Sequence, residues 1–164
     1  MRTVMRKVRA ENGQALVEFA FVLPLLLLFL FAIIDFGIAL NQQNADTNIA
    51  NIAVRDAAVI GTTTSQTCGS TTETTLGAWA QCESTSIGGP ALNSVCVGDI
   101  ASATPSNTYT SGDPIEVKVT SSFSWLKIVS QASGGPSSSI ASSATMRMEG
   151  SLTGTNPFLS PTCS

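Results

Sequence analysis

The chain has 164 residues, enough for one modest domain and an anchor but not for two large cores. Only 12% of the residues are charged and the net charge is −3, and the absence of a basic stripe beyond residue 9 argues against nucleic-acid binding. The chain contains no histidine, so it lacks the commonest general base and the commonest zinc ligand. We therefore expect no enzyme, no metal site and no cofactor.

Residues 1–13 form a short basic leader. It holds half of the basic residues of the chain, namely Arg2, Arg6, Lys7 and Arg9. A basic segment before an apolar run is typical of a membrane-targeting signal. Its positive charge keeps the segment on the cytoplasmic side of the membrane. We therefore expect the leader to stay cytoplasmic and the rest of the chain to be exported.

Residues 14–40 are overwhelmingly apolar, interrupted by Glu18, Pro24 and Asp35. A helix of this length, at about 1.5 Å per residue, crosses a hydrocarbon core of about 30 Å. Pro24 frees one backbone carbonyl and is expected to kink or loosen the helix, although membrane helices also tolerate proline without consequence. We expect a single-pass protein of the cytoplasmic (inner) membrane with an extracytoplasmic C-terminal domain.

Residues 41–61 are predicted to continue the same helix outside the lipid. Ile49, Ile52, Ala53, Val59 and Ile60 recur there at helical spacing, and Gly61 is expected to end the helix. One helix is therefore expected from about residue 14 to about residue 60, with the apolar face of its second half packed on a sheet.

Residues 62–164 form an exported domain rich in Ser and Thr. Alternating apolar residues predict strands near 114–125 and 140–149, the first pointing Ile115 through Trp125 inward, and a weaker strand around 95–100. A short helix over 74–82 carries Leu76 and Trp79 inward. The fold class is α+β: a long N-terminal transmembrane helix that continues into a soluble half and packs on a small, mostly antiparallel sheet.

The charges of the two strongest strands bear on their register if they pair antiparallel as neighbours. Placing Lys118 opposite Glu149, or Glu116 opposite Arg147, brings opposite charges together. An intermediate register sets Glu116 against Glu149 and Lys118 against Arg147, so that like charges repel. We expect one of the first two registers.

Four cysteines follow the apolar segment: Cys68, Cys82, Cys96 and Cys163. An even number of cysteines in an exported domain fits an oxidising compartment, whereas buried thiols would indicate a reducing one. We expect two disulfide bridges, and the spacing leaves their connectivity open. A loop such as Cys68 to Cys82 would contribute about 3 kcal/mol to stability. Thiol labelling without reductant is expected to find almost no free thiol.

The junction between leader and helix reads Gly-Gln-Ala-Leu-Val-Glu-Phe at residues 13–19. It resembles the prepilin cleavage signature of type IV-related pilins, most closely the tight-adherence (Flp/Tad) branch. With residues 34–37 and 143–149, the chain is similar to TadE-like minor pilins, well over residues 10–60 and loosely over 112–150. The resemblance implies cleavage between Gly13 and Gln14 by a prepilin peptidase. It also implies contacts with other pilin and minor pilin subunits, the membrane assembly platform and the lipid bilayer.

The residues at this junction also support such a role by their own chemistry. Gly13 has no side chain, so its backbone can lie extended in a peptidase cleft, although Asn12-Gly13 could also be an ordinary turn before the helix. A carboxylate such as Glu18 is costly in an apolar helix unless it is paired. The new α-amine of Gln14 in a neighbouring subunit could pair with it, while Phe19 completes the assembly motif; alternatively, Glu18 extends to the headgroups.

Two functions from different classes follow. The first is a minor pilin-like subunit that acts in pilus assembly or initiation, and hence in surface adhesion. Such a subunit is located in the membrane or in an extracellular pilus. The second is a secreted or single-pass anchored extracytoplasmic binding domain with an ordinary signal or anchor sequence, supported by the small-x-small pattern Gly37-Ile38-Ala39. An exported enzyme is disfavoured because the chain contains no histidine and no nucleophile elbow.

Overall fold

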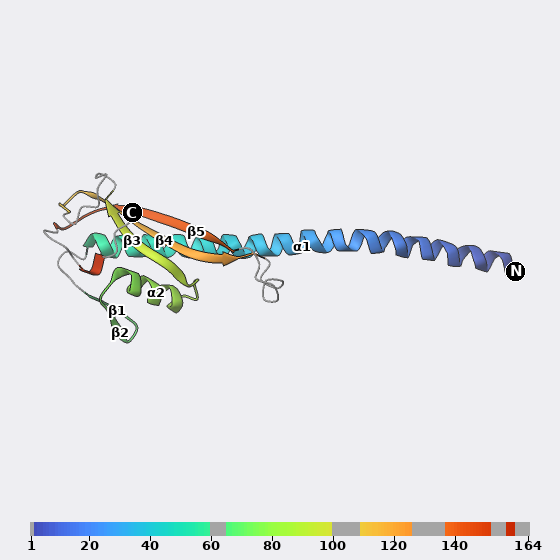
Figure 1. The fold of residues 1–164 in the computed structure, drawn as a ribbon, viewed down its shortest axis with the longest axis horizontal. Helices are drawn as coiled ribbons and strands as arrows, with labels where there is room; N and C mark the ends of the chain where they lie inside the picture. The colour runs from blue at the N-terminus through green and yellow to red at the C-terminus, as the bar shows by residue number, and fades with distance from the viewer. Residues whose placement is uncertain (1, 60–64, 100–108, 126–136, 152–156, 160–164) are drawn as a thin grey trace. The chain divides into compact units, whose positions relative to one another are not determined.

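A computed structural model of the chain describes residues 2–59, 65–99, 109–125, 137–151 and 157–159 (Figure 1). Two compact units are distinguished, Met1–Ile38 and Ala39–Ser164. The elements in chain order are α1 (Arg2–Val59), β1 (Gln66–Cys68), β2 (Thr71–Glu73), α2 (Leu76–Ser86), β3 (Leu92–Asp99), β4 (Pro114–Ser124), β5 (Ser137–Arg147) and the 3-10 helix η1 (Pro157–Leu159). The α+β fold class is therefore confirmed.

Helix α1 begins earlier than the sequence predicted. It starts at Arg2 instead of near residue 14, so the leader is part of the helix and Asn12-Gly13 is not a turn. The physical reason is that residues 2–11 contain neither proline nor glycine, and a single glycine inside a helix costs only about 1 kcal/mol. The described part of α1 ends at Val59, and the predicted stop at Gly61 lies outside the described residues.

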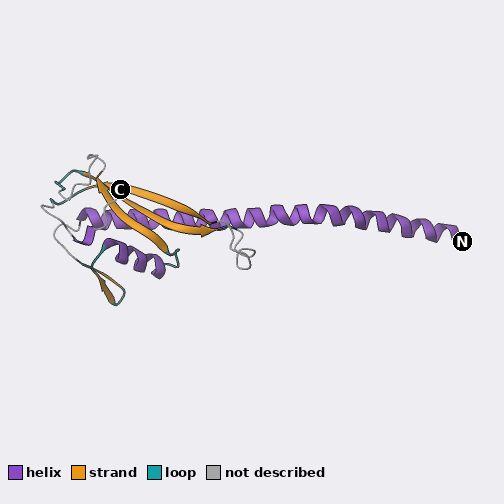
Figure 2. Cartoon of the chain, in the orientation of Figure 1, coloured by secondary structure: helices purple, strands orange, loops and turns teal. Residues whose placement is uncertain are grey.

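The sheet of the second unit has three antiparallel strands in the order β3-β4-β5, and β1 and β2 form a separate antiparallel pair (Figure 2). The central strand β4 alternates as predicted, because Ile115, Val117 and Val119 are fully buried while Lys118 is exposed. Trp125 is an exception. It follows the last strand residue, lies partly exposed with its ring edge-on to Phe123, and donates from Nε1 to Ser138 Oγ.

The C-terminal part of α1 packs into the same core as the sheet, but largely through small residues. Ile49 is buried and Ile52 is partly buried, as predicted, whereas Val59 is 57% exposed. Ile60 lies outside the described residues. Val54 is buried as well, together with four alanines, Ala50, Ala53, Ala57 and Ala58. Because alanine projects little beyond the backbone, a face made largely of alanine allows a helix to approach a sheet closely.

Strands β4 and β5 pair antiparallel as expected, but in neither of the predicted registers. Glu116 faces Thr145 and Lys118 faces Ser143, so no charge faces another in this ladder. Exposed charge pairs contribute only about 0.2–1 kcal/mol, too little to set the register. The residues that follow β5 set the register instead. Met148 is buried and exchanges backbone hydrogen bonds with residues 112–113, and the amide of Glu149 leaves the sheet to donate to the carbonyl of Ala58.

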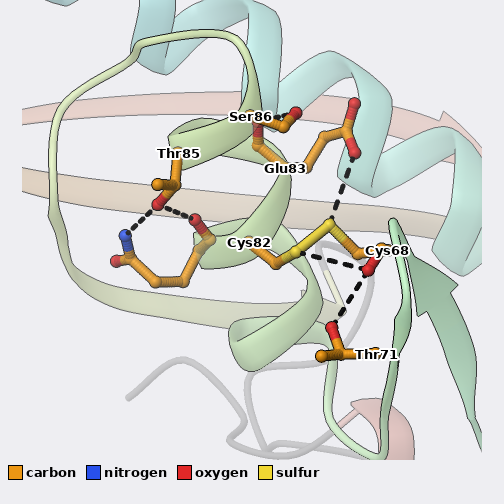
Figure 3. Close-up of a disulfide and its surroundings, with 7 residues drawn as sticks. Cys68, Thr71, Cys82, Glu83, Thr85 and Ser86 are labelled. Carbon is orange, nitrogen blue, oxygen red and sulfur yellow. Dashed lines mark hydrogen bonds between the residues drawn. A yellow bond between two sulfur atoms is a disulfide. The ribbon is translucent and has the colours of Figure 1, made fainter.

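Helix α2 and the β1-β2 pair are joined covalently by the Cys68–Cys82 disulfide, whose Cα atoms are 6.2 Å apart (Figure 3). The hydroxyl of Thr71 donates to the carbonyl of Cys68 and helps to hold the short hairpin. Strands of three residues have little stability of their own, so the crosslink, worth about 3 kcal/mol for a loop of this size, anchors them. Cys96 is also disulfide-bonded, and Cys163 lies outside the described residues.

The position of α2 was predicted correctly in its essentials. Its N-cap is Thr75, whose hydroxyl accepts a hydrogen bond from the Ala78 amide at 3.2 Å. Leu76 and Trp79 are both buried, as their helical spacing predicted. The helix extends to Ser86, four residues beyond the expected segment.

Candidate assembly site

The apolar part of α1 has no partner within the described chain. Every residue from Gln14 to Ile34 is exposed, on all sides of the helix. In the described part of the chain, α1 is the one helix long and apolar enough to cross a membrane. Apolar side chains exposed all round a helix require lipid or other helices as their surroundings, which is compatible with a membrane anchor.

The residues of the predicted cleavage site lie at the start of this apolar run. Gly13 is exposed and helical, and a Cβ atom built on it would meet no other atom within 4 Å. Gln14 and Glu18 are four residues apart and therefore share one helix face. Gln14 Nε2 donates to Glu18 Oε1 at 3.3 Å, so the structure brings these two predicted residues together.

Phe19 and Pro24 are the remaining predicted site residues on the helix. Phe19 is 61% exposed, beside Glu18, with its ring free to contact lipid or another helix. Pro24 lies inside α1, which continues without interruption from Arg2 to Val59. A loosening of the helix at Pro24 stays a prediction.

A buried polar cluster in the second unit was not predicted from the sequence. Asp46 of α1 is fully buried, and the hydroxyl of buried Ser121 in β4 donates to its Oδ2 at 2.5 Å. Gln42 Nε2 in turn donates to Ser121 Oγ at 2.8 Å and to the carbonyl of Ser122 at 3.0 Å. Sequence periodicity contained one signal: Asp46 shares the helix face of Ala39, Ala50 and Ala53. Ala53 was predicted on this face, whereas the burial of Ala39, Ala50 and Asp46 was not, because alanine is a weak marker of burial.

Asp46 is a carboxyl group whose environment favours its neutral form. Burial raises its pKa, and the hydrogen bond from Ser121 only partly opposes this effect. Its other oxygen, Oδ1, is buried and has no hydrogen-bond partner among the described residues. Burial raises the pKa of Asp56 too. Its Oδ1 accepts a hydrogen bond from Gln66 Nε2, whereas its Oδ2 is buried and has no partner in the part of the chain that the structure describes. No group of metal-ligating residues is found among the described residues.

These two groups predict that the domain is more stable in mild acid than at neutral pH. A raised pKa means that the folded state binds the proton more tightly than the unfolded state. Their contribution to the stability of the folded state is therefore fully present below the usual aspartate pKa. It is lost as the pH rises through the raised pKa of the folded state. Asp46→Asn, which imitates the neutral acid, should raise the melting temperature at neutral pH and flatten its pH dependence.

Asp113 provides a control of opposite sign for thermal unfolding measured across pH. Hydrogen bonds from the hydroxyl and amide of Thr110 lower the pKa of this exposed carboxyl group. Its contribution is therefore present above the usual aspartate pKa, and Asp113→Asn should lower the melting temperature at neutral pH. If Asp46→Asn also lowered the melting temperature at neutral pH, burial would not disfavour the charged form of Asp46 as proposed.

The described chain combines one long N-terminal helix, apolar and exposed in its first part, with an antiparallel sheet that packs on its second part. The family model described as TadE-like protein matches residues 13–58, which cover the candidate assembly site and most of α1. Residues 13–58 therefore match the TadE-like family, and the resemblance of this part of the chain to TadE-like, pilin-like proteins of Tad pili is confirmed. No curated protein and no solved structure matches the chain.

Proposed function

We propose that the protein is a minor pilin-like subunit of a tight-adherence pilus. Its leader, residues 1–13, is cytoplasmic and is removed between Gly13 and Gln14 by a prepilin peptidase. Residues 14–40 span the inner membrane, residues 41–61 continue the helix outside it, and residues 62–164 form the exported domain. The family match over residues 13–58 supports this proposal.

The single observation that carries the assembly role is Glu18. Its carboxylate is exposed within an apolar helix, one turn from Gln14, and its nearest polar contact is the neutral Gln14 amide at 3.3 Å. No cation neutralises it in this contact. Removal of the leader would create a cation, the α-amine of Gln14, at the same depth in the membrane. In a low dielectric, pairing this amine with Glu18 of a neighbouring subunit would favour assembly over the separate subunits.

The partners follow from these steps. The prepilin peptidase acts on the leader junction, other pilin and minor pilin subunits contact the apolar helix, and the assembly platform and lipid surround it. The subunit acts in pilus assembly or initiation and through it in surface adhesion. The TadE-like family is structural and is not known for enzymatic activity.

N-terminal sequencing of the protein extracted from membranes of its own host tests the proposal. A chain that begins at Gln14 supports it. A start at Leu40 would indicate the alternative, a secreted domain released by an ordinary signal peptidase, and an intact Met1 would indicate a plain membrane anchor. The alternative is less well supported because Ala39, the residue before that cleavage point, is a buried residue of α1, whereas Gly13 is exposed.

A further inference from the structure

The part of α1 that follows the apolar segment carries four asparagines at regular spacing: Asn41, Asn44, Asn48 and Asn51. Steps of three, four and three residues place them in one row along a helix with 3.6 residues per turn. All four are exposed. At 100° per residue, the row points away from Asp46 and the alanines that pack on the sheet. We call this row the asparagine stripe.

The stripe is unusual for a solvated helix surface. Asparagine is a poor helix former, and exposed helix positions are ordinarily filled by Glu, Lys, Arg or Gln. The other exposed residues between Leu40 and Arg55, Gln43 and Thr47, are also neutral, so this surface of the helix is free of charge. The Asn51 amide donates to the carbonyl of Thr47, and among the described residues the side chains of the other three make no hydrogen bond. Four polar groups are therefore presented in line, without any charge.

This pattern fits one occupant best, a second copy of the same chain. If the protein is anchored as proposed above, all copies enter the membrane in the same direction, so two neighbouring helices are parallel. In a parallel pair each residue faces its own counterpart. A charge would therefore repel itself, whereas an asparagine amide has both a donor and an acceptor and can bind an identical amide. A single asparagine at a core position of a parallel helix pair also fixes the register and the oligomeric state, at a cost in stability.

We propose that the asparagine stripe is the contact surface for a second copy of the chain, forming a parallel helix pair directly outside the apolar segment. Arg55 is the next residue at the same spacing and is exposed. It would face its own counterpart, so the paired segment ends at Asn51. Amide pairs across parallel helices hold the two copies in one axial register.

Thiol crosslinking in a bilayer tests this surface. The full-length chain carrying Asn44→Cys or Asn48→Cys is reconstituted in vesicles of phosphatidylethanolamine and phosphatidylglycerol, without other pilus proteins, and treated with a short bis-maleimide. Gln43→Cys is the matched control, because Gln43 is exposed on the same helix but lies well to the side of the stripe. The unmodified chain measures the background from native cysteines. Dimer yields at positions 44 and 48 should be at least about fivefold above that at 43, since only stripe residues face each other.

Charge substitutions provide a second measurement. Asn48→Asp and Asn48→Lys should each reduce dimer formation at least about tenfold, since like charges would face each other in a partly desolvated contact. The two variants mixed in one vesicle should recover the dimer, because the charges are then opposite. Equal crosslinking at 43, 44 and 48, or charge variants that dimerise unchanged, would overturn the inference.

A dimer that forms only when another pilin is added would also overturn the inference, because the occupant would then be a different chain. The test is independent of pilus assembly in cells. If no dimer formed but the chain still matured to Gln14 in cells, the proposed contact through the asparagine stripe would be rejected and the proposed function would stand. A dimer formed by a chain that is not processed in cells would reject the proposed function alone.

Discussion

Gly13→Val should leave the chain at full length in the membrane, with almost no mature form detectable. Cleavage after residue 13 requires this backbone to enter a peptidase cleft in an extended conformation, and α1 must unwind locally because Gly13 is helical before cleavage. Glycine favours this unwinding and presents no side chain to the cleft, whereas a β-branched residue restricts the backbone and adds bulk. The ratio of precursor to mature protein on an immunoblot of membrane fractions measures the effect.

The structure makes this substitution easy to interpret. A Cβ atom at Gly13 meets nothing within 4 Å, so valine should not disturb the packing of the chain itself. Gly37 is the matched control, since it is also exposed, helical and free of contacts within 4 Å. Gly37→Val should therefore mature normally. Normal maturation of Gly13→Val as well would rule out Gly13 as the scissile position.

The parts of the fold that could be predicted from the sequence are those with a strong period. The alternation of apolar residues from Ile115 to Phe123, interrupted by Ser121, predicted both β4 and the face that it buries. Leu76 with Trp79 predicted the inner side of α2. The long uncharged run predicted the apolar half of α1. In each case large apolar residues recur with one period over several turns or strand repeats, so local sequence and burial agree.

The parts that were missed depend on interactions without a local signature. The register of β4 and β5 depends on where Met148 is buried and on hydrogen bonds between distant backbone groups. The burial of Asp46 depends on Ser121, which lies 75 residues away. The early start of α1 shows a different effect: a basic leader with good helix formers joins the helix that follows. The register and the burial of Asp46 emerge from tertiary contacts, whereas the start of α1 follows from local helix propensity.

The candidate assembly site was predictable in position but not in its contacts. Gln14 and Glu18 are four residues apart in α1, and their side chains meet within one chain. The proposed partner of Glu18 belongs to another subunit after processing, so a single uncleaved chain contains only the neutral amide contact. This difference between the two contacts can be tested by substitution.

Glu18→Ala should leave insertion and leader cleavage intact and should reduce pilus assembly more than about tenfold, because the Gln14 amine of a neighbouring subunit then lacks its counter-charge at low dielectric. Gln14→Ala is the matched control: it removes the amide that contacts Glu18 at 3.3 Å but keeps the α-amine, so assembly should be nearly normal. Sheared surface pili, normalised to the mature protein in membranes, provide the measurement. Normal pili with Glu18→Ala, or equal losses in both variants, would show that assembly does not depend on pairing Glu18 with the amine.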